Sequence, residues 1–358
     1  MKDILVVFGS MTPEHDLSCK SAATILEGID REKFNPIAVG ITKEGKWFYT
    51  EASTEDIKSA TAWLESPTNK KCMLDTDFGS HRLIVFEDDN TVSFKNVDCV
   101  FARIAGNMGE DGKLQGLFEV AGIPYVGCGV MSSACSMDKD ISYMFADSIG
   151  LRRPQTQVLW KKDFDEKGKG LVEDVKEDLA AKVGFPIFVK PTSTGSSVGI
   201  SKAHDEEELW KALEVAFSYG DKVVLEENIV GTEIKVGILG NDDPKIGALC
   251  ELTANGDFND FDTKYIAHSS TKKIPAELDP ETEAMIKDYT IKIYKALDCK
   301  GFSRIDHFLT EDGQLVFNEV NSMPGFQPTS VYPVLFDAIG MSYTELITEL
   351  LELAMENK

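Results

Sequence analysis

The segment 302–321 constrains the fold of this chain more than any other part, because it predicts a hairpin whose register can be counted. Two strand-like runs flank Asp312-Gly313, a pair that is typical of a two-residue type I′ turn. Counting outward from the turn places two pairs of polar residues directly opposite each other: Asp306 with Glu319, and Arg304 with Asn321. Since side chains alternate along a strand, all four are expected on one face of the hairpin.

The two acids of this hairpin predict a bound cation. Asp306 and Glu319 would repel each other across the ladder. Their carboxylates and the Asn321 amide oxygen are hard ligands that suit Mg²⁺, which usually keeps waters and completes its shell with substrate phosphates. In the alternative interpretation the face is solvated and Arg304 bridges the two acids. Arg304 beside a metal would also be placed to serve an oxyanion.

The charge balance of the chain restricts its partners. The sequence holds 37 Lys and Arg residues against 60 Asp and Glu residues, a formal net charge of −23. Nucleic acids and anionic membranes would be repelled over most of such a surface, so neither is an expected partner. A small anionic substrate must be held by a few placed cations, metal ions or backbone amides.

Cysteine usage and the lengths of the apolar runs predict a cytoplasmic protein. The seven cysteines form an odd set without a C-x-x-C pair, which fits neither a disulfide framework nor a zinc site. The first apolar run, Ile4–Phe8, is too short for a signal peptide. No run approaches the roughly 18 apolar residues of a membrane span. We therefore expect a protein that is neither exported nor membrane-embedded.

The length of 358 residues and the order of elements predict an α/β protein with several domains. A first domain with a buried sheet is expected at 1–128, where strands alternate with helices. A smaller domain at 129–225 contains a Gly/Ser-rich loop whose backbone N–H groups are free to approach a phosphate. A third domain is expected at 226–358. It includes a long polar loop at 253–274, and loops of this length are usually functional.

Apolar periodicity predicts two further elements near the junction of the first and second domains. A short strand is expected at Pro124–Val126, and one continuous helix over Met131–Ile149.

A series of motifs in fixed order resembles the D-alanine–D-alanine ligases of the ATP-grasp fold. The motifs span essentially the whole chain: Glu14-His15-Asp16-Leu17-Ser18, the run 109–116, the run 123–127, Met137-Asp138-Lys139, Lys190-Pro191 with 195–199, Lys264-Tyr265, and the run 318–326. Such an ordered series is far more specific than any of its members. The resemblance implies a three-domain ATP-grasp fold in which ATP is held between the central and C-terminal domains.

This resemblance implies an ATP-dependent ligation in two steps that releases ADP and phosphate. The carboxylate of a first D-alanine attacks the γ-phosphate, and the amine of a second D-amino acid attacks the resulting acyl phosphate. Phosphorylation supplies the leaving group that a carboxylate lacks, and phosphoryl transfer depends on positioning and charge neutralisation. Asp306, Glu319 and Asn321 match the Mg²⁺ ligands of the family, with two ions expected and Mn²⁺ able to substitute. A homodimer is also implied.

Carried over position by position, the resemblance implies a nucleotide site. Lys139 and Lys190 match the phosphate-contacting lysines. Lys264 matches a contact to the γ-phosphate or acyl phosphate, carried on the family's ω-loop at 253–274. Glu226 and Glu233 match the adenine-edge and ribose acceptors. The linker beside the adenine comprises Glu227, Asn228 and Ile229.

The resemblance also implies residues for the first substrate and the reacting atoms. Glu14 matches the acceptor for the ammonium of the first D-alanine. Arg304 and the N–H of Gly325 match the stabilisers of the tetrahedral oxyanion. Tyr265 matches the residue that locks the ω-loop towards Ser196.

For the second substrate, Ser330 and Lys264 match contacts to the carboxylate, and Gln327 lies near its side chain. Several positions depart from the family pattern: Ser10 replaces a glycine, Thr12 a serine, Ala105 a histidine and Gln327 a threonine. The change at Ala105 bears on the first D-alanine, and the change at Gln327 bears on the second substrate.

Three functions follow from these observations. The favoured one is a D-alanine–D-alanine ligase for peptidoglycan precursors. The second is a D-alanine–D-serine ligase of the vancomycin-resistance type, motivated by Gln327 and Ala105. The third is a nucleotide-binding regulator that has lost ligation, which the retention of the candidate catalytic residues opposes. Lys264-Tyr265 is typical of the peptide-forming branch rather than of relatives that use D-lactate. The sequence does not separate a housekeeping from a resistance role.

Overall fold

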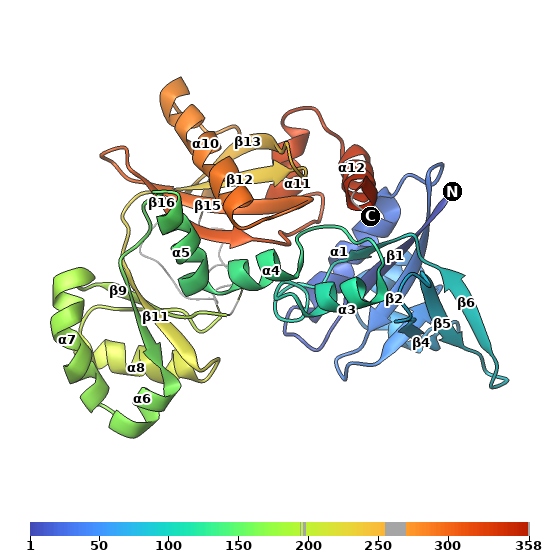
Figure 1. Ribbon diagram of the computed structural model, residues 1–358, viewed down its shortest axis with the longest axis horizontal. Helices are drawn as coiled ribbons and strands as arrows, with labels where there is room; N and C mark the ends of the chain where they lie inside the picture. The colour runs from blue at the N-terminus through green and yellow to red at the C-terminus, as the bar shows by residue number, and fades with distance from the viewer. Residues whose placement is uncertain (194, 196–197, 255–269, 357–358) are drawn as a thin grey trace.

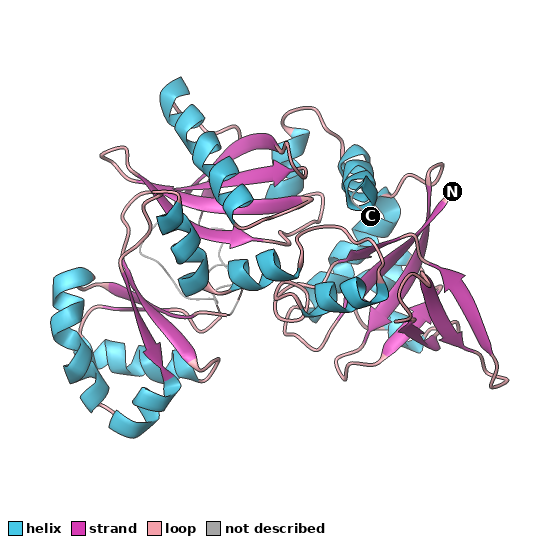
Figure 2. Cartoon of the chain, viewed as in Figure 1, coloured by secondary structure: helices cyan, strands magenta, loops and turns pink. Residues whose placement is uncertain are grey.

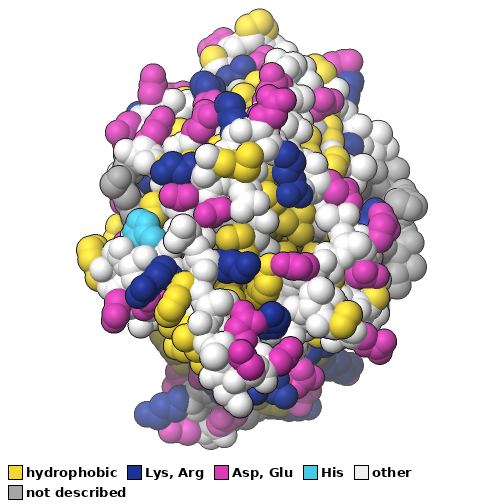
Figure 3. Space-filling view, turned by 90° about the vertical axis from the view of Figure 1, so that its right-hand side faces the viewer, with side chains coloured by type: hydrophobic (Ala, Val, Ile, Leu, Met, Phe, Trp, Pro, Cys, Tyr) yellow, Lys and Arg dark blue, Asp and Glu magenta, His cyan; other side chains and the backbone are white. Residues whose placement is uncertain are grey.

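The computed structural model describes residues 1–193, 195, 198–254 and 270–356. Within this part of the chain, three β-sheets are packed with helices, as the α/β prediction requires (Figures 1 and 2). None of the described helices combines the length and the apolar character needed to cross a bilayer. On the face in Figure 3, acidic and basic side chains are interspersed.

The first sheet has the strand order β6-β5-β4-β3-β2-β1-β7, with β1 parallel to β2 and β7 and the other pairs antiparallel. Its strands are β1 (Lys2–Gly9), β2 (Phe34–Ile41), β3 (Trp47–Thr50), β4 (Lys70–Leu74), β5 (Arg82–Phe86), β6 (Val92–Asn96) and β7 (Cys99–Ala102). Its helices are α1 (His15–Gly28), α2 (Thr54–Lys58), the 3₁₀ helix η1 (Ala62–Glu65) and α3 (Lys113–Ala121). The predicted strand at Pro124–Val126 is wrong, since only Tyr125 forms an isolated bridge, to Val100.

The second sheet is antiparallel with the order β10-β9-β11-β8. Its elements are β8 (Thr156–Trp160), α6 (Lys161–Lys167), α7 (Gly170–Lys182), β9 (Ile187–Pro191), β10 (Ser201–Ala203), α8 (Glu206–Phe217) and β11 (Lys222–Glu227). Asp205 caps α8 by accepting the N–H of Glu208, and three glutamates follow in its first turn, where the helix dipole favours acids. The apolar face of α8 packs under the sheet.

The third sheet is antiparallel with the order β14-β13-β12-β15-β16. Its elements are β12 (Thr232–Leu239), β13 (Lys245–Ala254), β14 (Ser270–Lys273), α10 (Pro280–Ala296), β15 (Phe302–Leu309), β16 (Leu315–Asn321), α11 (Val331–Asp337) and α12 (Tyr343–Glu356). Both ends of the expected loop 253–274 are strand, in β13 and β14, while 255–269 lies outside the described residues. The apolar side of α12 packs against the first sheet.

The expected single helix over 131–149 is in fact two helices, α4 (Val130–Met137) and α5 (Lys139–Ser148). Asp138 separates them with an extended backbone, and its carboxylate accepts the N–H groups of Asp140 and Ile141. An N-cap of this kind starts a new helix, because it satisfies amides that lack partners in the first turn. The break makes Lys139 the first residue of α5, and its N–H donates to the Thr192 carbonyl at 3.1 Å.

The predicted hairpin is confirmed, although its turn length and the residue pairing near the turn differ from the prediction. Thr310 pairs with Gln314, so the turn has three residues and ends at Gly313, whose φ of +79° suits glycine. Farther along, Asn318 is an extra residue of β16 and forms a β-bulge, because Phe317 pairs with His307. The longer turn and the bulge shift the pairing by one residue in opposite directions, so their effects on the register cancel. The predicted opposite pairs therefore form: Asp306 with Glu319 and Arg304 with Asn321.

Candidate active site

A buried ion pair occupies the second sheet beside α5. Lys190 on β9 and Glu226 on β11 lie on neighbouring strands, and their charged groups are in direct contact. Tyr143 of α5 donates its hydroxyl to the other Glu226 oxygen at 2.7 Å. Glu226 is only 2% exposed, so the protein itself binds both carboxylate oxygens. Burial raises the pKa of Tyr143 well above its usual value, which keeps this hydroxyl a donor.

The third sheet contributes a second group of buried charges. Arg304 donates to both oxygens of Asp306, from Nε and Nη2 at 2.8 Å each. Lys235 on β12 lies 3.0 Å from Asp306 Oδ2 and 2.6 Å from Glu233 Oε1. Asp306 is fully buried. Burial alone would raise the pKa of Asp306, but the Arg304 guanidinium and the Lys235 ammonium hold it below its usual value.

Lys139 joins these two groups of charges. Its ammonium lies 3.0 Å from Glu319 Oε2, and Glu226 and Asp306 also act on its charge. Burial opposes the charge of Lys139, but the carboxylates, Glu319 above all, outweigh burial and raise its pKa. Asn321 Nδ2 lies 3.4 Å from Glu319 Oε1. The three predicted metal ligands therefore lie in one cluster with Lys139.

The donor set at the hairpin fits a hard divalent cation. Two carboxylates and one amide supply only oxygen, and Mg²⁺ characteristically takes its remaining ligands from water and phosphate. In the described ranges, no three His, Cys, Asp or Glu side chains gather as a metal centre of their own. Part of the countercharge that the sequence argument assigned to a metal comes from protein cations: Arg304, Lys235 and Lys139.

The linker expected beside the adenine connects the second and third sheets. Asn228 and Ile229 follow β11, lead towards β12 and are half-buried. Glu227 accepts Arg152 Nη2 at 3.3 Å and the N–H of Gln155 at 3.0 Å. The Glu227 carboxylate is therefore fixed against the start of β8.

Glu14 lies at the start of α1 and makes no capping bond with its side chain. A Cβ built on Gly106 would lie 3.0 Å from Glu14 Oε2, so this carboxylate lies against the glycine. The Glu110 carboxylate accepts the N–H of the same glycine. Burial raises the pKa of Glu110 to about 7, and Glu14 adds to the rise, while Arg103 and Arg304 oppose it. Glu110 is thus coupled electrostatically both to Glu14 and to Arg304.

The loop between β16 and α11 brings together the residues expected around the second substrate. Ser330 Oγ accepts the N–H of Gln327 at 3.2 Å. The same oxygen would lie 3.2 Å from a Cβ built on Gly325, so the loop is closed tightly around that glycine. The side chains of Gln327 and Ser330 are both half-buried. The other expected residues lie outside the described part of the chain: Ser196, Lys264 and Tyr265.

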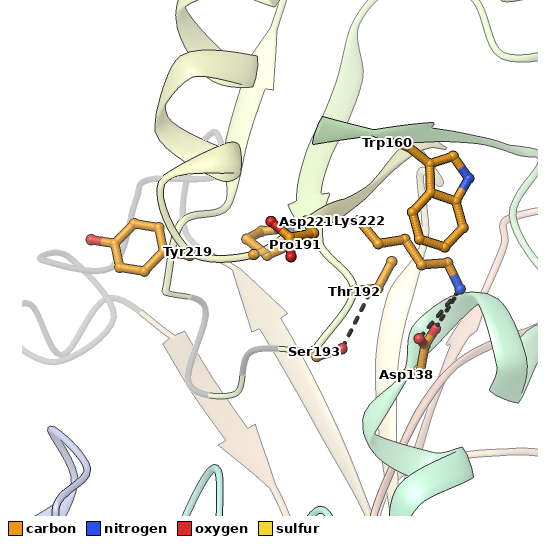
Figure 4. Close-up of a pocket in the computed structure, with 9 residues that line it drawn as sticks. Asp138, Trp160, Pro191, Thr192, Ser193, Tyr219, Asp221 and Lys222 are labelled. Carbon is orange, nitrogen blue, oxygen red and sulfur yellow. Dashed lines mark hydrogen bonds and ion pairs between the residues drawn. The ribbon is translucent and has the colours of Figure 1, made fainter. Parts of the chain in front are cut away.

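A hollow of about 320 Å³ opens beside the start of α5 (Figure 4). Lys222 lines it and lies 3.2 Å from Asp138 and 2.6 Å from Asp140, so its charge is neutralised by the first turn of α5. Trp160 and Tyr219 add aromatic surface. The residues that line this hollow include none of the predicted site residues.

Comparison with known families covers nearly the whole chain. Residues 3–128 match the family described as "D-ala D-ala ligase N-terminus", and residues 145–352 match "D-ala D-ala ligase C-terminus". The chain belongs to the D-alanine–D-alanine ligase family. The predicted resemblance, the ATP-grasp fold and the enzyme class, an ATP-dependent ADP-forming ligase, are therefore confirmed.

Individual relatives agree with this assignment. The D-alanine–D-alanine ligase of Acetivibrio thermocellus is 42% identical, and the match covers 99% of this chain and 96% of that protein. The ligase of Caldicellulosiruptor bescii is 39% identical over 99% and 95%. Among solved structures, the VanG D-Ala:D-Ser ligase of Enterococcus faecalis matches with a TM-score of 0.88 at 35% identity, covering 99% of both chains. The D-alanine-D-alanine ligase of Coxiella burnetii matches with 0.84 at 28%, over 99% and 94%.

Three residues of this member of the D-alanine–D-alanine ligase family received no role from the sequence: Lys235 and Tyr143, which are buried, and Glu110, which is half-buried. Lys235 follows Glu233 by two residues, and a period of two along a strand signals a shared face. Tyr143 follows Lys139 by four residues on α5, which signals a shared helix face. Glu110 lies in a quoted motif, but its position beside Glu14 depends on how two loops meet.

Proposed function

We propose that this chain is an ATP-dependent ligase that joins D-alanine to a second D-alanine through an acyl phosphate, for peptidoglycan precursors. The observation that best supports this is the Lys139–Glu319 contact, which links the predicted phosphate and metal residues of two different sheets. A phosphate-release assay with ATP, Mg²⁺ and a panel of D-amino acids tests the proposal. Release that depends on D-alanine is expected, and release that ignores D-amino acids would contradict it.

In this proposal, nucleotide lies between the central and C-terminal domains, divided as 1–128, 129–225 and 226–358. Lys139, Lys190 and Lys264 bind the phosphates. The Lys190 ammonium has three N–H donors, so it keeps donors for phosphate oxygen beside its contact with Glu226. The adenine and ribose groups are bound by the other residues of the proposed nucleotide site: Glu226, Glu227, Asn228, Ile229 and Glu233.

The same proposal places Mg²⁺, as two ions or with Mn²⁺ in substitution, at Asp306, Glu319 and Asn321. When bound, such ions neutralise the charge of the phosphoryl group during transfer. The rest of the chemistry depends on the chain's own groups. Arg304 is held rigidly by two hydrogen bonds to Asp306, which leaves its remaining N–H groups to face a developing oxyanion.

For the amino-acid substrates, we propose that Glu14 accepts the ammonium of the first D-alanine. The N–H of Gly325 shares the oxyanion with Arg304. Ser330, with Lys264, binds the carboxylate of the second substrate beside Gln327. Tyr265 locks the ω-loop towards Ser196 and keeps water from the acyl phosphate. We further propose that the enzyme is a cytoplasmic homodimer.

A second candidate function is a D-alanine–D-serine ligase. The TM-score of 0.88 with the VanG D-Ala:D-Ser ligase favours it, as does Gln327 in place of threonine. An amide at this position can hydrogen-bond the hydroxymethyl group of D-serine. The ratio of kcat/KM for D-serine and D-alanine separates the two candidates.

A further inference from the structure

Lys235 is a buried lysine without a role in the proposed reaction. It lies on β12, directly opposite Asp306 of β15, and is 8% exposed. Its ammonium contacts Glu233 at 2.6 Å and Asp306 at 3.0 Å. One ammonium thus joins a proposed ribose acceptor to a proposed metal ligand.

The cluster around Lys235 is balanced in charge. Its four acids are Glu226, Glu233, Asp306 and Glu319, and its four cations are Lys139, Lys190, Lys235 and Arg304. The four acids alone would attract a divalent cation strongly, since Glu226 and Asp306 are buried and Glu233 and Glu319 are half-buried. Because the cations cancel their charge, the cluster exerts little net attraction on a free metal ion. A nucleotide brings its own negative phosphates, which restores that attraction.

We propose that Lys235 is an internal cation that prevents the acidic cluster from binding a divalent metal ion before nucleotide arrives. This inference rests on the metal site of the proposed function. An ion bound to Asp306 would lie within a few ångströms of the Lys235 ammonium, and like charges repel at that separation. Lys235 therefore makes metal binding depend on nucleotide, since only the phosphates outweigh its charge.

Binding of Mn²⁺ to the nucleotide-free protein, followed by the electron paramagnetic resonance signal of the free ion, tests this inference without turnover. The wild-type protein should bind Mn²⁺ weakly alone and tightly with ADP. Lys235→Met keeps an unbranched side chain only one atom shorter and removes the charge, so it should bind Mn²⁺ at least about tenfold more tightly without nucleotide. Lys235→Arg keeps the charge and should behave as wild type. Lys245→Met, on the exposed end of β13, is the matched control and should change nothing.

The outcomes separate this inference from the proposed function. If the wild-type protein does not bind Mn²⁺ with ADP, the proposed metal site is wrong, and the role of Lys235 falls with it. If the wild type binds Mn²⁺ with ADP, but nucleotide-free Lys235→Met binds Mn²⁺ no more tightly than the nucleotide-free wild type, only the role of Lys235 is overturned. Should Lys235→Met not fold, as judged by circular dichroism, Lys235→Gln makes the same test, because its amide removes the charge and keeps hydrogen-bond donors near the acids.

Discussion

Asp306 and Glu319 lie directly opposite each other on β15 and β16, yet their carboxylates contact different cations of the protein. Asp306 is held by Arg304 and Lys235, whereas Glu319 contacts Lys139 of α5. The two acids therefore connect the third sheet to different neighbours. A substitution of Asp306 and a substitution of Glu319 therefore disturb different ion pairs.

Glu319→Gln should remove most ligase activity, by about 100-fold or more, because the proposed metal loses a charged ligand. Folding should change little, since Glu319 is half-buried and the relief of its repulsion with Asp306 offsets the lost charge of its contact with Lys139. Phosphate release and urea unfolding measure the two effects. Glu311→Gln, in the exposed turn of the same hairpin, is the control. Unchanged Mg²⁺-dependent turnover in Glu319→Gln would refute the metal assignment.

Tyr143→Phe should lower the free energy of unfolding by about 2 kcal/mol, because a buried carboxylate loses a charged hydrogen bond. The KM for ATP should also rise, since Glu226 is no longer fixed in place. Urea unfolding and steady-state kinetics test these effects against Tyr219→Phe, whose side chain is exposed. Equal stability of the two variants would show that the Tyr143 hydroxyl contributes nothing.

Glu110 should make stability depend on pH near neutrality. Its pKa rises from 4.5 to about 7 in the folded chain, so the folded state binds this proton more tightly than the unfolded state. The resulting stabilisation is complete below pH 4.5 and is lost as the pH rises to about 7. The difference in unfolding free energy between wild type and Glu110→Gln should fall by about 2 kcal/mol over this window. Parallel pH curves for the two proteins would contradict the assignment.

Ser10 occupies a backbone conformation that suits glycine, with φ of +133° in a fully buried position. Its hydroxyl lies 2.8 Å from Thr12 Oγ1. Ser10→Ala and Ser10→Gly both lose that contact, but only glycine relieves the strained backbone. Ser10→Gly should therefore be more stable than Ser10→Ala by about 1 kcal/mol in urea unfolding. The reverse order would show that this backbone is not strained.

Gln327→Thr should reduce the preference for D-serine over D-alanine a few-fold, because threonine cannot reproduce the reach of the amide. Competition between the two acceptors, measured as the ratio of kcat/KM in wild type and variant, decides this. An identical ratio in both proteins would exclude Gln327 from acceptor choice.

The hairpin shows why sequence reasoning placed the candidate metal residues correctly despite an error in detail. The type I′ count missed both the three-residue turn and the bulge at Asn318. The longer turn shifts the strand pairing by one residue, and the bulge shifts it by one residue in the opposite direction. The original pairing is therefore restored before the strands reach Asp306. Alternation along the strand preserved the face, because both irregularities lie closer to the turn.

Other parts of the fold could not be predicted from local pattern. The break at Asp138 depends on a single capping carboxylate within an otherwise helical run. Strands β3 to β6 were not predicted, since they are short and β6 has no buried residue. The roles of Lys235 and Glu110 depend on neighbours from distant segments. Local periodicity does not encode such neighbours.

The packing of α12 on the first sheet has a consequence for the order in which the chain is made. Leu346, Ile347, Leu350 and Leu351 are buried in the same core as Ile4, although more than 300 residues separate them. A nascent chain emerging from the ribosome therefore cannot complete this core until residues 343–356 have been synthesised. Until then the sheet exposes an apolar face, and such surfaces are the ones that chaperones shield during synthesis.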